Sequence, residues 1–114
     1  MCRVDTNWSC FGTPAVILEN KVLKLAVLPE YGAKIIDILY KPADTHLLWL
    51  NPRNKPGKIP FGALYDDNFN GGWDELFPTD IPCKINGEMY SDHGELWAVP
   101  HRGEAVGADK ADLD

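Results

Sequence analysis

The fold is decided by residues 15–40, which read AVILENKVLKLAVLPEYGAKIIDILY. Ala15–Glu19 and Val22–Leu28 are rich in Val, Ile and Leu, and the short connection between them contains Asn20. Two such runs around a two-residue connection predict a β-hairpin. Pro29 ends the second run because its ring nitrogen has no hydrogen to donate to a neighbouring strand.

The flanking segments continue this pattern. Ala33–Tyr40 follows a turn at Gly32 and predicts a third strand, and His46–Leu50 predicts a short fourth strand. Residues 1–13 show no clear period and suit an edge strand or an arm laid across a sheet. Strands at this spacing, with no long helical period between them, indicate an all-β fold with antiparallel strands.

The second half of the chain is less regular. Pro and Gly interrupt residues 51–60, which predicts a surface loop. Two adjacent glycines and several aromatics in residues 61–80 suit backbone folded tightly against a ligand site. An Asn-Gly dipeptide within residues 84–90 predicts a short hairpin. Asp92–Val99 predicts a further strand.

Composition and charge limit the classes of function. The chain has 114 residues, of which 45% are hydrophobic and 25% charged, as in an ordinary globular domain. Residues 1–60 carry eight Lys/Arg against five Asp/Glu (+3), whereas residues 61–114 carry three against twelve (−9), which together give the net charge of −6. An acidic second half argues against nucleic acid as a partner and suits a hydroxyl-rich ligand or a cation. A merely soluble surface explains it equally well.

Three cysteines without a Cys-x-x-Cys spacing argue against a disulfide framework or a zinc site, and we expect reduced thiols. The N-terminus has no basic region followed by an apolar run, and no apolar stretch is as long as a membrane span. We therefore expect a cytoplasmic protein with no membrane partner.

The strand predicted over Asp92–Val99 would place chemistry-bearing side chains on one face. Because side chains alternate along a strand, His93, Glu95 and Trp97 would lie together, with small and apolar residues on the other face. A carboxylate and an imidazole hydrogen-bond hydroxyls, and an indole offers a flat apolar plate, so the set suits a sugar. The alternative is that Trp97 belongs to the core and that His93 is a structural hydrogen-bonding residue.

Two other arrangements are chemically weaker. Asp74 and Glu75 resemble an acid/base pair, but on a strand they point to opposite faces and would not serve one substrate. We expect one of them to brace a loop and the other to contact ligand or solvent. A metal site built from His93, Asp92 and Glu95 is disfavoured because its same-face set offers at most two ligands. We therefore expect no metal.

Two motifs carry a resemblance to a known family. The first is Gly-Gly-Trp-Asp-Glu-Leu-Phe-Pro-Thr at residues 71–79, and the second is Asp-His-Gly-Glu-Leu-Trp at residues 92–97. Together they resemble the front part of an aldose 1-epimerase, a galactose mutarotase-like protein. Residues 25–35 are similar to the opening of that family, and the resemblance covers most of residues 15–100.

The resemblance implies a large antiparallel β-sandwich with a sugar bound on a concave face, and interconversion of the α and β anomers of an aldose without a cofactor. It maps the family's sugar-contacting His onto His93 and suggests Arg53 for the family's early Arg, although Pro52 departs from the usual Asn there. We expect substrate contacts from the motif residues and this arginine, namely His93, Trp73, Glu75, Glu95, Arg53 and Asp74. The ligand would be an aldose or a sugar phosphate.

The family's general acid, general base and a further substrate-binding Asp lie downstream of the His-Gly motif, beyond the end of this sequence. We therefore expect residues 1–102 to be the N-terminal part of a mutarotase-like sandwich and residues 103–114 to be a polar, frayed tail. Whether this chain alone is an enzyme stays open. The alternatives are a non-catalytic sugar-binding β module using Trp73 and Trp97, or an interaction protein that forms homo-oligomers through open sheet edges.

Overall fold

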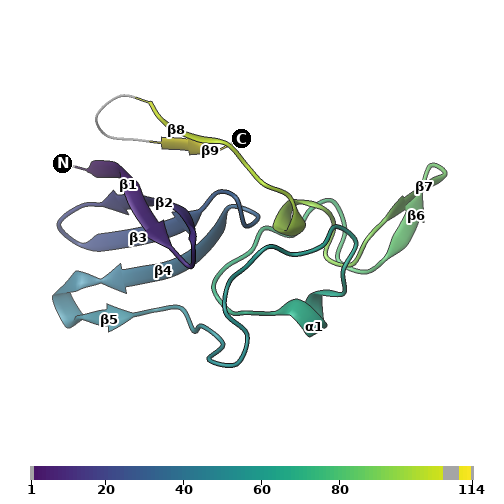
Figure 1. Cartoon of the computed structure of the whole chain (residues 1–114), viewed down its shortest axis with the longest axis horizontal. Helices are drawn as coiled ribbons and strands as arrows, with labels where there is room; N and C mark the ends of the chain where they lie inside the picture. Colours follow the sequence, from purple (N-terminus) through teal and green to yellow (C-terminus); the bar gives the residue numbers. More distant parts are fainter. Residues whose placement is uncertain (1, 107–110, 114) are drawn as a thin grey trace.

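The computed structural model describes residues 2–106 and 111–113, and its main element is a five-stranded antiparallel sheet (Figure 1). The strands follow one another in chain order across the sheet. They are β1 (Arg3–Cys10), β2 (Thr13–Glu19), β3 (Leu23–Leu28), β4 (Lys34–Tyr40) and β5 (Thr45–His46). The expectation of an all-β, antiparallel architecture is confirmed at this level.

The hairpin predicted from residues 15–28 is present, and Asn20 shapes its turn. The Asn20 side chain accepts hydrogen bonds from the backbone amides of Val22 and Leu23, both at 2.8 Å. This satisfies two amides at the end of the strand pair, which is why Asn is favoured in such turns. The N-terminal residues form an edge strand, since β1 pairs only with β2 in the sheet order.

One face of the sheet holds the core. Small and branched side chains from three strands pack there, with Leu28 fully buried. The cluster consists of Ala15, Ile17, Ala26, Leu28 and Ile36, with Cys10, Tyr31 and Leu50 packed against it. Each buried methylene contributes about 0.8 kcal/mol, so the repeated aliphatic positions of β2 and β3 stabilise the sheet.

The fourth strand is shorter than the sequence predicted. We expected His46–Leu50, but β5 ends at His46, and beyond it Leu50 forms only an isolated bridge with Gly71. The chain turns away after β5 and meets a distant segment, where the Gly72 amide donates to the Trp49 carbonyl at 2.8 Å. Hydrogen bonds to residues 70–72 thus take the place of a longer β4–β5 ladder.

Beyond the sheet the chain is mostly loop, with α1 (Tyr65–Asn68), the β6–β7 hairpin and a short 3₁₀ helix, η2 (Leu96–Ala98). The hairpin, Cys83–Ile85 with Glu88–Tyr90, projects from one end of the molecule (Figure 1). Its turn residues have the positive φ angles that Asn-Gly tolerates, 50° at Asn86 and 87° at Gly87. The hairpin prediction is confirmed.

The strand predicted over Asp92–Val99 is wrong. His93 and Gly94 both have left-handed backbones, with φ of 58° and 73°, and η2 follows directly. A Cβ at Gly94 would lie 2.0 Å from the Phe77 carbonyl oxygen, so the chain here is packed against residue 77 in a form that only glycine permits. This turn folds Trp97 inward, and the alternation assumed for a strand does not apply.

The C-terminal segment contains a second short hairpin, in which β8 (Gly103–Ala105) pairs with β9 (Ala111–Leu113). We expected residues 103–114 to fray, and residues 103–105 are instead paired. For residues 107–110 and 114 that expectation lies outside the described residues. Within the described part of the chain, no helix has the length and apolar character needed to cross a membrane.

Candidate functional site

The site is anchored to the sheet by a buried ion pair between Lys34 and Asp74. Lys34 Nζ lies 2.7 Å from Asp74 Oδ2 and donates to the Gly71 carbonyl at 2.6 Å. The side chains of Lys34 and Asp74 are only 5% and 6% exposed. Asp74 Oδ1 is buried without a hydrogen-bond partner in the described part of the chain. Asp74 is thus the residue that braces a loop, whereas Glu75 is exposed.

The segment 73–75 runs beside β4, and its side chains point alternately to the two sides of the sheet. Trp73 and Ile35 exchange backbone hydrogen bonds of 2.8 and 3.0 Å. Trp73 and Glu75 line a cavity of about 360 Å³ with apolar residues of the sheet, while Asp74 turns the other way toward Lys34. The expectation that Asp74 and Glu75 face opposite sides is confirmed, because Asp74 pairs with the buried Lys34 and Glu75 lines the cavity.

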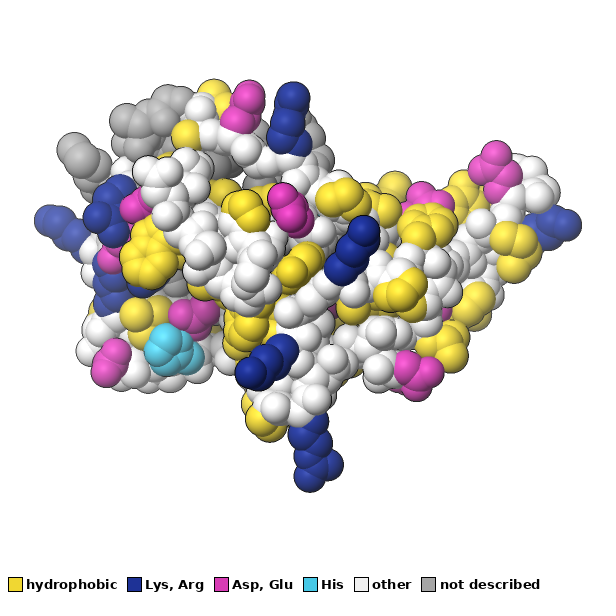
Figure 2. All heavy atoms as spheres, viewed as in Figure 1, with side chains coloured by type: hydrophobic (Ala, Val, Ile, Leu, Met, Phe, Trp, Pro, Cys, Tyr) yellow, Lys and Arg dark blue, Asp and Glu magenta, His cyan; other side chains and the backbone are white. Residues whose placement is uncertain are grey.

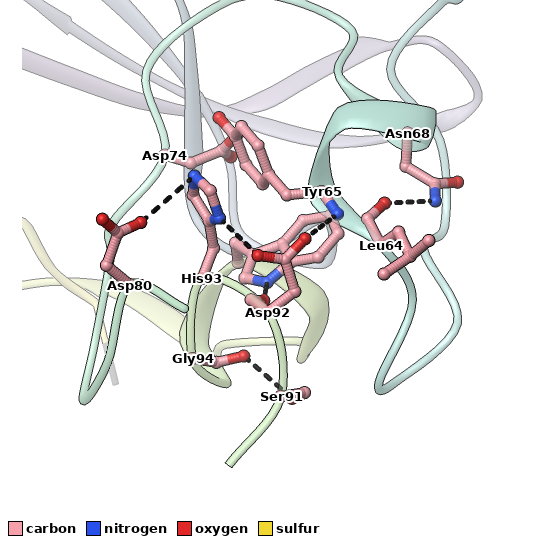
Figure 3. Close-up of polar contacts among 10 residues, drawn as sticks. Leu64, Tyr65, Asn68, Asp74, Asp80, Ser91, Asp92, His93 and Gly94 are labelled. Atoms are coloured by element: carbon pink, nitrogen blue, oxygen red, sulfur yellow. Dashed lines mark hydrogen bonds and ion pairs between the residues drawn. The ribbon is translucent and has the colours of Figure 1, made fainter. Parts of the chain in front are cut away.

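Tyr65, the first residue of α1, joins the sheet to the His-Gly turn (Figure 3). Its hydroxyl donates to Asp74 Oδ2 at 3.0 Å, and its backbone amide donates to Asp92 Oδ2 at 2.7 Å. Its ring stacks on the His93 imidazole, with centroids 3.8 Å apart and planes within 2°. Burial, followed by the neighbouring Asp74 charge, raises the pKa of Tyr65, so the phenol keeps its proton and acts as a donor.

His93 is held on three sides. Its backbone amide donates to the Asp80 carbonyl at 2.6 Å, and its Nδ1 lies 3.0 Å from Asp92 Oδ1. Because a carboxylate only accepts, His93 Nδ1 carries the proton in this contact. Nε2 lies 3.9 Å from the exposed carboxylate of Asp80, and the His93 side chain is 26% exposed. The hydrogen bond from His93, together with the Tyr65 amide, lowers the pKa of Asp92.

Trp97 is a core residue, so its expected role as an exposed sugar plate is wrong. Only 4% of Trp97 is exposed, and its indole nitrogen donates to the Asp92 carbonyl at 3.0 Å. Its ring meets Tyr65 edge-on with centroids 4.9 Å apart. Glu95 is partly buried, and its amide donates to the Phe77 carbonyl. The predicted row of His93, Glu95 and Trp97 on one strand face does not exist.

The remaining expected residues are divided between two places. Trp73 is 54% exposed and, with Glu75, belongs to the cavity on the opposite side from Asp74. Arg53 lies in the exposed loop after β5, where its amide donates to Asn51 Oδ1 at 3.0 Å. The structure therefore brings together Asp74, Asp92 and His93 through Tyr65, and it leaves Trp73, Glu75 and Arg53 outside this group.

Tyr65, Lys34 and Asp80 belong to the site and were missed by sequence reasoning. Lys34 stands in a strand where a charge on the buried face was a usable signal, since such a Lys needs a partner. Tyr65 begins the single-turn helix α1 and Asp80 lies in a loop, and neither belongs to a sequence motif. We name the group of Tyr65, Asp74, Asp80, Asp92 and His93 the Tyr65–His93 cluster.

The chemistry of the cluster is that of hydrogen bonding and proton transfer. Among the residues whose side chains the structure describes, no three His, Cys, Asp or Glu come together as a metal site. Comparisons with family models, with curated proteins and with solved structures find no match for this chain. The resemblance to the aldose 1-epimerases thus rests on the two motifs and on residues 25–35.

Proposed function

We propose that the chain is the sugar-binding N-terminal part of an aldose 1-epimerase-type β-sandwich, with His93 as its principal ligand contact. The observation that carries the proposal is the setting of His93. Asp92 fixes Nδ1–H, Tyr65 covers one ring face, and Nε2 lies 3.9 Å from the exposed carboxylate of Asp80. The ring nitrogen Nε2 of His93 and the carboxylate of Asp80 beside it can both hydrogen-bond a sugar hydroxyl.

The second face of the sheet supports the sandwich architecture. Leu18, Leu25, Val27 and Ile35 line the cavity of about 360 Å³ on the side that carries Trp73. A sheet with apolar side chains on both faces is stable in water when both faces are covered. A further layer on this face is the arrangement that a sandwich provides, and in the mutarotase-like family this layer comes from later strands.

Catalysis by this chain alone is not part of the proposal. Anomer exchange needs one group to take the proton of the anomeric hydroxyl and another to protonate the ring oxygen. The cluster provides one imidazole and a set of carboxylates, of which Asp74 is tied to Lys34 and Asp92 to His93. The chain therefore supplies contacts, and an acid/base pair is expected from downstream residues of the family pattern.

A second candidate is a fragment that associates through its surface, and the exposed hydrophobic side chains favour it. Figure 2 shows them over much of the visible face and along the β6–β7 hairpin. Several are more than half exposed, namely Leu47, Trp49, Phe61, Leu64, Trp73, Phe77, Ile81 and Met89. Apolar surface of this extent is typical of proteins that bury it against another chain or layer.

The test is a sugar titration followed by NMR at several protein concentrations, with glucose, galactose and a hexose 6-phosphate. We expect sugar to perturb the resonances of His93 and its neighbours, and His93→Ala to abolish the response. His46→Ala is the matched control, because His46 also pairs with an aspartate but lies exposed on β5. The same samples report anomer exchange rates.

The outcomes separate the candidates. A response to sugar without faster exchange supports a binding part. Exchange that rises with protein concentration and falls in His93→Ala would place the acid/base pair within this chain and overturn the division of roles proposed here. Concentration-dependent association with no response to any sugar would favour the second candidate.

A further inference from the structure

We infer that Tyr65 is a positioning residue for His93, holding its imidazole in one tautomer and orientation, and that the buried Lys34–Asp74 pair holds Tyr65 in turn. The inference rests on the proposed function only in taking sugar as the ligand that His93 contacts. It concerns a residue outside both sequence motifs.

The first step is the double contact that Tyr65 makes with the His93 turn. Its amide donates to one oxygen of Asp92, and the other oxygen of that carboxylate takes the Nδ1–H of His93. The Tyr65 amide thus orients the Asp92 carboxylate, and this carboxylate in turn orients the imidazole. A carboxylate placed by a second donor in this way fixes which histidine nitrogen carries the proton.

The second step is the stacked ring pair. Centroids 3.8 Å apart and planes within 2° leave the imidazole no freedom to rotate out of plane without breaking the contact. Tyr65 is itself fixed by the edge of the buried Trp97. Aromatic pairs of this kind contribute beyond their buried area, so the contact orients His93 as well as covering it.

The third step links this arrangement to the sheet. The Tyr65 hydroxyl donates to Asp74 Oδ2, the same oxygen that pairs with Lys34 Nζ. Lys34 lies at the start of β4, and its ammonium also binds the Gly71 carbonyl. A series of contacts thus runs from β4 through Asp74 and Tyr65 to His93. The sheet anchors this series at its β4 end.

The charged groups facing His93 come from three segments: Asp92 beside Nδ1, Asp80 near Nε2, and Asp74 behind the Tyr65 hydroxyl. Only Asp92 forms a short contact with the ring. Tyr65 separates the imidazole from the buried ion pair, since its ring lies on His93 and its hydroxyl on Asp74. Loss of the ring would leave His93 without a stacked face and would leave the backbone amide of residue 65 as its remaining link to Asp92.

The experiment uses the full chain and compares Tyr65→Leu with Tyr65→Phe. The ¹H and ¹³C shifts of the His93 ring report the stack, and its ¹⁵N shifts near neutral pH report the tautomer. In the unsubstituted chain we expect the His93 ring protons to resonate upfield of those of an unstacked histidine and to show NOE cross-peaks to the Tyr65 ring. Tyr65→Leu is expected to lose the upfield shift and to mix the tautomers. Tyr65→Phe keeps the stacked ring, with smaller changes in the His93 signals that report the lost hydroxyl contact with Asp74.

Sugar affinity, where sugar binds, is expected to weaken about two- to tenfold in Tyr65→Leu and to be restored in Tyr65→Phe. Tyr31→Leu is the matched control, since Tyr31 is also partly buried but packs on the sheet core and donates to the Phe11 carbonyl. It should leave the His93 signals unchanged.

Two results would overturn the inference. One is an unsubstituted chain whose His93 ring shows neither upfield protons nor cross-peaks to Tyr65, a measurement that depends on no variant folding. The other is a folded Tyr65→Leu variant with unchanged His93 signals. If the His93 signals respond as expected but no sugar binds to any form, the proposed function fails and the positioning role stands.

Discussion

The sheet of residues 3–46 and the loop region of residues 47–102 are held together by different physics. The sheet repeats one interaction, an aliphatic side chain buried between neighbouring strands, and its ion pairs lie on the outside. Glu19 with Lys41 is an example, with side chains 21% and 30% exposed. The loop region has little regular structure and depends on single contacts, above all the buried Lys34–Asp74 pair.

This difference predicts how each region responds to substitutions that remove a contact. Distributed burial tolerates the loss of one contact, because many similar contacts remain. A region fastened at a few points loses its arrangement when one of those points is removed. Substitutions in the loop region should therefore have large local effects, and similar substitutions in the outer ion pairs of the sheet should have small ones.

The largest effect is expected for Lys34→Met, which leaves the Asp74 carboxylate buried without its partner. Removing one member of a buried pair costs about 3–5 kcal/mol of unfolding free energy. Urea unfolding measures this loss, and hydrogen exchange should show that amides of residues 65–74 lose protection before those of β2 and β3.

Lys41→Met is the matched control for this substitution, because the Lys41–Glu19 pair is partly exposed. It should cost no more than about 1 kcal/mol. Equal losses in the two variants would show that the Lys34–Asp74 pair is not the anchor of the loop region.

An intermediate effect is expected for Gly94→Ala. The new Cβ would meet the Phe77 carbonyl oxygen at 2.0 Å on a backbone with φ of 73°. Gly87→Ala has a similar φ of 87° but open space around its Cβ, so it isolates the cost of the left-handed backbone alone. Gly94→Ala should lose about 1–3 kcal/mol more than Gly87→Ala in thermal or urea unfolding.

The smallest effect is expected for Glu19→Gln, and it should depend on pH. Lys41, and to a lesser degree Arg3, lowers the pKa of Glu19 in the folded chain. The folded pKa lies below the unfolded value of about 4.3, so the stabilisation is present at neutral pH and disappears as the pH falls through the folded pKa. Unfolding of Glu19→Gln and of the unsubstituted chain should differ slightly at pH 7, less in high salt, and not at all once Glu19 is protonated. A stability difference between the two proteins that widens at acidic pH would contradict the lowered pKa of Glu19.

The sheet could be predicted from sequence because its signals are local. Runs of Val, Ile and Leu around Asn20, and the Asn-Gly pair of the later hairpin, determine strands and turns through contacts between close neighbours in the chain. The prediction that Asp74 and Glu75 point to opposite sides followed from the alternation of side chains along a strand, and in the structure the bridge between Trp73 and Ile35 holds this segment beside β4.

The site was predicted only in part because its geometry depends on distant contacts. Asp92–Val99 has a strand-like pattern, yet packing of Gly94 on Phe77 and burial of Trp97 impose a turn there. His93 was singled out from its motif, but Tyr65 was not, because its partners lie 9 and 28 residues away in the chain, at Asp74 and His93. Such pairings leave no period in the sequence.

The bridge between Leu50 and Gly71 has a consequence for protein engineering. Hydrogen bonds on either side of it, from Asn51 to the Asn70 carbonyl and from Gly72 to the Trp49 carbonyl, clamp the two ends of the intervening excursion. Its ends therefore stay in place whatever its length, and doubling a clamped loop adds only about 0.6 kcal/mol of closure entropy. The exposed stretch of residues 60–62 is accordingly a suitable point at which to insert a reporter peptide without moving the sheet.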